Sequence, residues 1–501
     1  ARTGDWSQLT DGQQFRMHTI RNESTAIVWF RRDLRLNDNP ALNQALCRYR
    51  TVIPVYIHSP GEERPWADGN ASCWWLHHSL MSLSAQLQGA GSRLILRSGV
   101  AIEQLQSLIE STGAGAVFWN RRYEPAVISR DAQVKSVLKG QGIEAESSNS
   151  SLLFEPWEIA TQTGKPYQVF TPFWRTCLGR EIAAPAPWPS PLSGAHAPSR
   201  WPDSDTLGNW NLLPRIPWDR AFYEAWKPGE SGAQQLLNEF LSSAVQRYGT
   251  GRDHPGIRGT SRLSPHLHFG EISPRQIWAA VQKAFRSHPP EDAQIFLKEV
   301  GWREFAYHIL YHYPRTPEAP LRSEFEEFPW ETSREWLAAW QRGRTGYPIV
   351  DAGMRELWTT GWMHNRVRMI VGSFLTKHLR ISWAEGARWF WDTLVDADLA
   401  SNTLGWQWIG GCGADAAPYF RVFNPMTQGE KFDPSGSYVR RWVPELAGLS
   451  NRVIHQPWSA SEAERQEAGV ELGKNYPRPI VDHSHAREQA LAAFAKIKKS
   501  P

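Results

Sequence analysis

The chain has 501 residues, enough for about two or three domains. With 41% hydrophobic and 21% charged residues, its composition is neither that of a disordered protein nor that of a fibrous one. Its 55 Lys and Arg against 51 Asp and Glu leave a formal net charge of +4, which excludes a strongly basic protein but leaves room for a local basic patch.

The cysteine spacing and the apolar runs bear on the compartment. No CxxC pair occurs among Cys47, Cys73, Cys177 and Cys412. This pattern argues against a disulfide framework or a metal site and favours a reducing compartment such as the cytoplasm. No run reaches the ~20 apolar residues that span a bilayer, so we expect no membrane partner. Met17 is a plausible native start, which makes residues 1–16 an expected upstream extension and places residues 1–25 outside the predicted domains.

Residues 26–155 alternate short apolar runs with helical patterns. The predicted strands are 26–30, 52–57, 93–96, 116–119 and a short one at 143–145, and the predicted helices are 40–48, 72–87, 102–111 and 126–139. This alternation predicts an α/β domain with a Rossmann-like, doubly wound parallel sheet. No GxGxxG follows any of these strands, so the dinucleotide fingerprint is absent.

A long connector and a helical region follow. Residues 156–232 are predicted to connect two domains, and from about residue 183 they are rich in Pro, Ser, Gly and Trp. The tryptophans indicate that this connector packs against the domains. From residue 233 to 501 helical periodicity dominates, which predicts an all-α domain to about residue 443 and then a less regular tail.

Four segments of the chain resemble the photolyase/cryptochrome family. They read WFRRDLRLNDNPAL (29–42), RYGTGRDHPGIRGTSRLSPHLHFGEISPR (247–275), GRTGYPIVDAGMRELWTTGWMHNRVRM (343–369) and DADLASNTLGWQWIGGCGADAAPYFRVFNP (396–425). The resemblance runs from about residue 26 to the end and is strongest to class I-type photolyases that act on cyclobutane pyrimidine dimers. It implies an antenna-binding α/β domain, an FAD-binding helical domain, and DNA containing a pyrimidine dimer as the partner of a monomer.

The resemblance implies a flavin site in the helical half. A lone TSxxS run is more often an ordinary helix cap, but here Tyr248 matches a flavin-contacting tyrosine twelve residues upstream of the run. Asp396 matches a carboxylate that pairs with Arg368 beside the flavin ring, and Asn402 matches the residue that faces its N5 edge. The implied cofactor-binding residues are Tyr248, Thr260, Ser261, Arg262, Leu263, Ser264, Asn365, Arg368, Asp396, Asp398 and Asn402.

Tryptophans supply the implied electron path and the lesion pocket. Trp406, Trp383 and Trp330 match a photoreduction chain from flavin to surface, although any single one of 27 tryptophans is more often a packing residue. The dimer must be flipped out of the duplex and held by aromatic walls. The residues implied to contact it are Trp302, Trp408, Glu299, Asn365 and Met369, with Arg303, Arg366 and Arg421 on the DNA backbone. Each arginine, taken alone, is more often a solvated surface charge.

An antenna is implied for the α/β domain. Asn120 and Glu124 resemble its folate segment, and a carboxylate suits the N–H groups of a pterin. A Glu at a strand end is also often only a cap or a surface charge. Methenyltetrahydrofolate is the favoured antenna, while a deazaflavin or no antenna remain alternatives.

The implied reaction is light-driven repair. Excited, fully reduced FAD gives an electron to the flipped dimer and receives it back after the ring opens. One alternative is a cryptochrome-type photoreceptor, disfavoured by Asn402 and the retained Trp302 and Trp408. Another is repair of (6-4) photoproducts, which needs a proton donor such as histidine where this chain has Met369.

Overall fold

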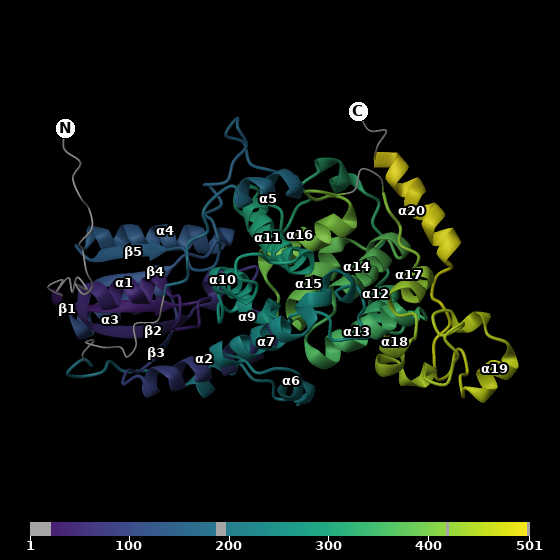
Figure 1. Cartoon of the computed structure of the whole chain (residues 1–501), viewed down its shortest axis with the longest axis horizontal. Helices are drawn as coiled ribbons and strands as arrows, with labels where there is room; N and C mark the ends of the chain where they lie inside the picture. The colour runs from purple at the N-terminus through teal and green to yellow at the C-terminus, as the bar shows by residue number, and fades with distance from the viewer. Residues whose placement is uncertain (1–21, 187–196, 417–419, 498–501) are drawn as a thin grey trace, which may run out of the picture.

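The computed structural model describes residues 22–186, 197–416 and 420–497, so most of the N-terminal extension expected from the sequence lies outside the described residues. An α/β domain occupies one end of the molecule and a helical domain the other (Figure 1). The five strands form one parallel sheet in the order β3-β2-β1-β4-β5. They are β1 (Asn22–Phe30), β2 (Tyr49–His58), β3 (Ile95–Ser98), β4 (Ala114–Asn120) and β5 (Glu144–Ser148).

Helices cover both faces of the sheet, which is why the central strands β1, β2 and β4 carry apolar runs. Along β1, Ala26, Val28 and Phe30 pack under two helices, while Ile27 and Trp29 pack under two others on the opposite face. The first pair is α1 (Pro40–Arg48) and α2 (Asn70–Gly89), and the second is α3 (Ala101–Thr112) and α4 (Pro125–Gly140). The doubly wound sheet predicted from the sequence is confirmed.

The connector is not a plain linker. It contains α5 (Phe170–Leu178) and α6 (Arg220–Ala225), with a short 3-10 turn at Leu207–Trp210. Trp210, Trp218 and Trp226 pack against the core of the α/β domain, as expected from the tryptophan content. Helix α5 instead packs with the helical domain, beside α11 (Glu291–His312) (Figure 1).

The second half of the described chain is helical apart from isolated bridges, which confirms the predicted fold class. Its remaining helices are α7 (Glu230–Ser242), α8 (Tyr248–Gly251), α9 (Ser264–His268), α10 (Pro274–Ala284), α12 (Arg334–Gln341), α13 (Pro348–Thr360), α14 (Asn365–Ser373), α15 (Trp383–Thr393), α16 (Leu399–Gly410), α17 (Pro425–Phe432), α18 (Ser437–Trp442), α19 (Glu462–Glu467) and α20 (His483–Ile497).

The tail is more regular than its sequence indicated. Helix α20 (His483–Ile497) lies well beyond residue 443, where the all-α domain was predicted to end. It packs Ala490, Ala493 and Ile497 into the main helical core. Small alanines dominate its inner face, so its apolar pattern is weak in the sequence. The expectation of a less regular tail is therefore wrong for this segment.

No helix in the described part of the chain is long and apolar enough to cross a membrane.

Candidate active site

A partly buried cation lies in the run that was predicted to bind phosphate. The Arg262 guanidinium lies over the rings of Trp226 and Trp362, 4.3 and 4.9 Å from their centres. Its Nε lacks a hydrogen-bond partner, and burial lowers the pKa of Arg262 to about 10. A buried cation is costly without a counter-ion, so an anionic group belongs here. The pyrophosphate of FAD fits this requirement, with the Thr260 and Ser264 hydroxyls on the same segment.

A second set of groups converges from three helices. Arg368 on α14 donates to Asp396 through two contacts of 2.8 and 3.0 Å, so the predicted ion pair is present. Asn402 on α16 donates its amide N–H to the carbonyl of Ala387 at 3.1 Å. This bond fixes the orientation of the amide and uses one of its two N–H groups, and the Asn402 oxygen can accept from an N–H donor such as N5 of a reduced flavin.

Asp398 departs from the predicted role. It caps α16 by accepting the Ser401 N–H, while its other oxygen accepts the Tyr307 hydroxyl and faces His268 at 3.8 Å. Burial opposes ionisation, but His268 and the charge of Arg303 hold the pKa of Asp398 well below its usual range. Both oxygens are thus occupied by the protein, and the structure does not turn this carboxylate toward a cofactor.

The three tryptophans of the predicted chain become less buried in order. Trp406 and Trp383 are 2% and 4% exposed, whereas Trp330 is only half-buried. The segment after Trp330 lies beside the one before Trp383, because the Glu331 N–H donates to the carbonyl of Arg380 at 2.7 Å. This gradient from core to surface is what an electron path to solvent requires. Sequence reasoning missed Trp340, whose ring lies 6.2 Å from that of Trp406 at 70°.

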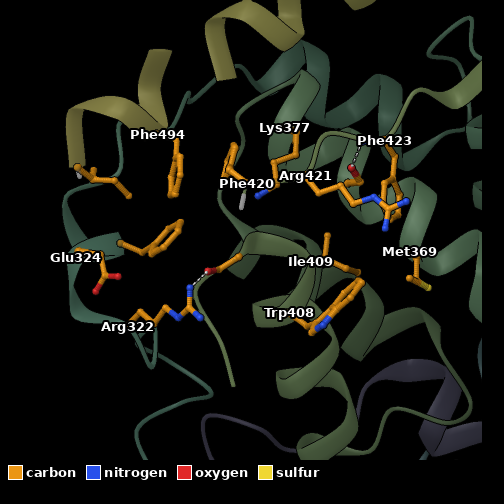
Figure 2. A pocket seen from close by; sticks show the side chains of 14 residues that line it. Arg322, Glu324, Met369, Lys377, Trp408, Ile409, Phe420, Arg421, Phe423 and Phe494 are labelled. Atoms are coloured by element: carbon orange, nitrogen blue, oxygen red, sulfur yellow. Dashed lines mark hydrogen bonds between the residues drawn. The ribbon is translucent and has the colours of Figure 1, made fainter. Parts of the chain in front are cut away.

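Two predicted lesion contacts and one predicted DNA-backbone contact share one cavity. Met369, Trp408 and Arg421 line it from α14, α16 and the loop that follows (Figure 2). Asn365 lies one turn before Met369 on α14 and is exposed. Trp302, on α11, stacks on Phe170 and does not line this cavity. Nearby on α11, Glu299 accepts from Arg252 at 2.5 Å, and the Arg252 guanidinium lies over the ring of the buried Tyr248.

The predicted DNA-binding arginines separate into two groups. Arg421 is exposed, and Arg366 is partly exposed and anchored to Asp253 at 2.7 Å. Arg303 instead points inward: it donates to the carbonyl of Ser151 at 2.6 Å and covers the ring of Tyr307. These contacts favour a structural role for Arg303, and its contact with the DNA backbone stays a prediction. The positive charge of Arg303 stabilises the ionised form of the buried Asp398 carboxylate. This role could not be predicted from the sequence.

A further cavity lies between the domains, at the carboxyl ends of β1 and β4, where the strand order reverses. This is the position at which open α/β sheets bind ligands. Glu124 and Trp66 line it from the α/β side, and Trp391 lines it from the helical side. The two indoles meet edge to face at 5.3 Å. Trp66 and Trp391 could not be linked by sequence, because more than three hundred residues separate them.

Asn120 is not part of this cavity. Its amide donates to Asp33 at 2.5 Å and to Asn39 at 2.7 Å, and its oxygen accepts the Ala41 N–H. The polar atoms of its side chain thus bind the loop after β1 and the start of α1, and an antenna contact by Asn120 stays a prediction. Glu124 does line the cavity, although its carboxylate also accepts from Arg122 at 2.9 Å.

Comparison with known proteins agrees with this arrangement. Residues 26–191 match the family model described as DNA photolyase, and residues 296–496 match that of the FAD binding domain of DNA photolyase. A deoxyribodipyrimidine photo-lyase of Agrobacterium fabrum is 52% identical over 95% of this chain and 98% of its own length. The chain belongs to the photolyase/cryptochrome family.

Two more members of the family are similar to this chain over most of its length. A crystal structure of a bacterial class III photolyase from Agrobacterium tumefaciens superposes with a TM-score of 0.92, at 50% identity over 97% of this chain and all of that one. The class of that enzyme differs from the class I type expected from the motifs. Cryptochrome-1 of Arabidopsis thaliana is 41% identical over 94% of this chain and 70% of its own length.

Proposed function

We propose that this protein repairs cyclobutane pyrimidine dimers in DNA with the energy of light. The observation that carries the proposal is the cavity lined by Met369, Trp408 and Arg421 in a protein that also has the Arg262 and Arg368–Asp396 groups expected around FAD. The cavity combines an aromatic wall, an apolar side chain and a cation, which are the groups that hold an unstacked base and its phosphate.

The protein's share of the reaction is binding, orientation and exclusion of water. When bound in its reduced form, FAD supplies the electron that opens the cyclobutane ring and accepts it back. Arg262 and the hydroxyls of Thr260 and Ser264 would hold the pyrophosphate, while Arg368 and Asp396 would set the charge beside the ring system. Arg366 and Arg421 would position the DNA backbone. Trp408 would form the aromatic wall of the Met369 cavity, and Trp302 would stack on the flipped dimer from α11, outside that cavity.

Repair of (6-4) photoproducts is disfavoured by the state of the nearest motif histidine. His364 is 3% exposed, and its Nδ1 accepts the Arg366 N–H as the cap of α14. Burial lowers the pKa of His364 to about 4, so its ring is neutral at neutral pH. A neutral, capping imidazole is not the proton donor which that reaction needs.

A photoreceptor without repair activity is the rival from another class. The 41% identity to cryptochrome-1 shows that the two functions share this fold. The retained lesion-pocket residues Trp408 and Met369, together with Asn402, favour repair.

The inter-domain cavity is proposed to bind the antenna, with methenyltetrahydrofolate favoured. Glu124 offers a carboxylate for the N–H groups of a pterin, and Trp66 and Trp391 offer flat faces for its rings. Replacing Trp391 by Ala should remove an antenna absorption band from the purified protein while the FAD content is unchanged. Loss of FAD together with that band would instead show a folding defect.

The decisive test uses the reduced protein and two duplexes, one with a cyclobutane thymine dimer and one with a (6-4) photoproduct. We expect light-dependent repair of the first only. Repair of the duplex with the (6-4) photoproduct would show that the protein is a (6-4) photolyase. Repair of neither, with FAD bound and photoreducible, would leave the photoreceptor function. We further propose that the protein acts as a monomer in the cytoplasm or another reducing compartment.

A further inference from the structure

Trp302, proposed above to stack on the flipped dimer, ends a series of parallel aromatic rings. Its ring stacks on Phe170 with a centroid distance of 3.8 Å and an interplanar angle of 9°. Phe170 in turn is stacked with Trp174, at 6.4 Å and 15°. Trp174 lies close to α11, because a Cβ on Gly301 would come within 2.5 Å of its ring. One face of Trp302 is thus covered and its plane is fixed from behind.

The second wall is tied to the same segment of the connector. The Trp408 indole N–H donates to the carbonyl of Asp415 at 3.1 Å. The Asp415 N–H donates to the carbonyl of Gln168 at 3.0 Å, and the Phe170 N–H is directed at the Asp415 carboxylate at 3.4 Å. Asp415 has a φ of 52°, a left-handed conformation that costs energy in most residues and that these contacts hold in place.

We propose that Phe170 is a positioning residue for the lesion, and that residues 168–170 brace both tryptophan walls from one point. This inference rests on the proposed repair function. The flipped dimer adds one more layer to the Trp302–Phe170–Trp174 pile, so the protein orders the stacking surface before DNA arrives. A wall that is already ordered costs less side-chain entropy when it binds its ligand.

The matched variants are Phe170→Leu and Phe173→Leu. Both remove a buried ring from α5, but Phe173 packs on Phe305 and His308 and has no stacking contact with Trp302. We expect Phe170→Leu to weaken binding to a duplex with a cyclobutane dimer by about 2- to 10-fold, the range of one aromatic pair. Binding to the undamaged duplex and the absorption spectrum of bound FAD should not change. Phe173→Leu should alter dimer binding by less than about twofold.

A second pair tests the bridge through Asp415. Asp415→Asn keeps both an acceptor for the Phe170 N–H and tolerance of the left-handed conformation, whereas Asp415→Ala removes both. We expect Asp415→Ala to weaken dimer binding and Asp415→Asn to preserve it. Fluorescence of 2-aminopurine opposite the dimer reports base flipping and should fall with affinity in Phe170→Leu and Asp415→Ala.

Equal losses in Phe170→Leu and Phe173→Leu would overturn the positioning role, as would unchanged dimer binding in Phe170→Leu. Failure of the proposed function looks different, because the wild-type protein would then bind damaged and undamaged duplexes alike before any variant is compared.

Discussion

The side chains of Arg303 and Arg421 lie in different surroundings. Arg421 is exposed at the rim of the Met369 cavity, whereas the Arg303 side chain is 11% exposed and lies among buried acceptors. A motif fixes the position of a residue along the chain, but it does not fix the side of the helix to which a long side chain turns. The partners of Asn120 and Asp398 could not be predicted either, because they come from distant parts of the chain.

The two arginines should respond differently to removal. Arg421→Ala should weaken DNA binding and lower the slope of log affinity against log salt by about one, the share of one phosphate contact. Arg303→Ala should leave that slope unchanged and lower the free energy of unfolding by on the order of 3 kcal/mol, because buried carboxylates lose their counter-charge. Titrations of DNA binding at several salt concentrations, with urea unfolding alongside, measure both. A lower salt slope in Arg303→Ala would place it on the DNA after all.

Lys377 makes stability depend on pH. It is 1% exposed, donates to the carbonyl of Gly410 at 2.7 Å and lies 3.4 Å from the ring centre of Phe420 (Figure 2). Burial lowers the pKa of Lys377 to about 7. Folding therefore releases a proton between this value and the higher pKa of the unfolded chain, and the free energy of unfolding rises with pH in that window.

The pH dependence of the free energy of unfolding is compared between the wild-type protein and Lys377→Met. Between about pH 7 and pH 9 the wild-type protein should gain up to about 1.4 kcal/mol per pH unit over this variant, measured by urea unfolding. Parallel stability profiles would mean that Lys377 keeps its proton in the folded protein.

At the scale of elements, the pattern of apolar residues predicted the presence and type of individual helices and strands. The run of β1 and the periodicity of α1 were visible because burial on a sheet repeats with a regular period along the chain. Helix α20 was missed because its inner face is alanine, and the location of α5 was missed because packing between distant elements leaves no periodic mark. The flavin groups were found by resemblance, whereas the bracing of the lesion walls needed the structure.

Glycine at one helix crossing sets the position of the first tryptophan of the electron path. A Cβ on Gly386 of α15 would lie 2.1 Å from the ring of Trp406 on α16, and that ring is also confined by Phe390 at 4.9 Å. Gly386→Ala should displace Trp406, slow photoreduction of bound FAD several-fold and cost about 1–3 kcal/mol of stability. Flash photolysis and urea unfolding measure these effects.

Gly140→Ala is the matched control, because nothing lies within 4 Å of a Cβ at that position in α4. It should leave photoreduction as it is. Unchanged kinetics in Gly386→Ala would show that Trp406 is not on the path.

At the scale of the whole molecule, the domains are joined by more than the connector. The loop after β1 reaches into the helical half, where Arg35 donates to the carbonyl of Gly270 at 2.9 Å and the Leu36 N–H donates to Glu230 at 3.0 Å. The cavity that includes Glu124 and Trp391 lies between these two halves, and the Trp391 indole N–H also donates across it to the carbonyl of Ala67 at 2.6 Å. Binding of an antenna in this cavity is therefore expected to raise the unfolding temperature of the whole protein.

The packing of helix α5 also affects where two related proteins can be recombined. It falls within the region matched by the first family model, yet its side chains complete the core of the second domain. A chimaera of two relatives joined near residue 191 would bring a foreign α5, with Phe170 and Trp174, against α11 of the other parent. Inheritance of the lesion-binding half as one unit therefore requires a crossover ahead of residue 156, within the chain that first appears to belong to the antenna half.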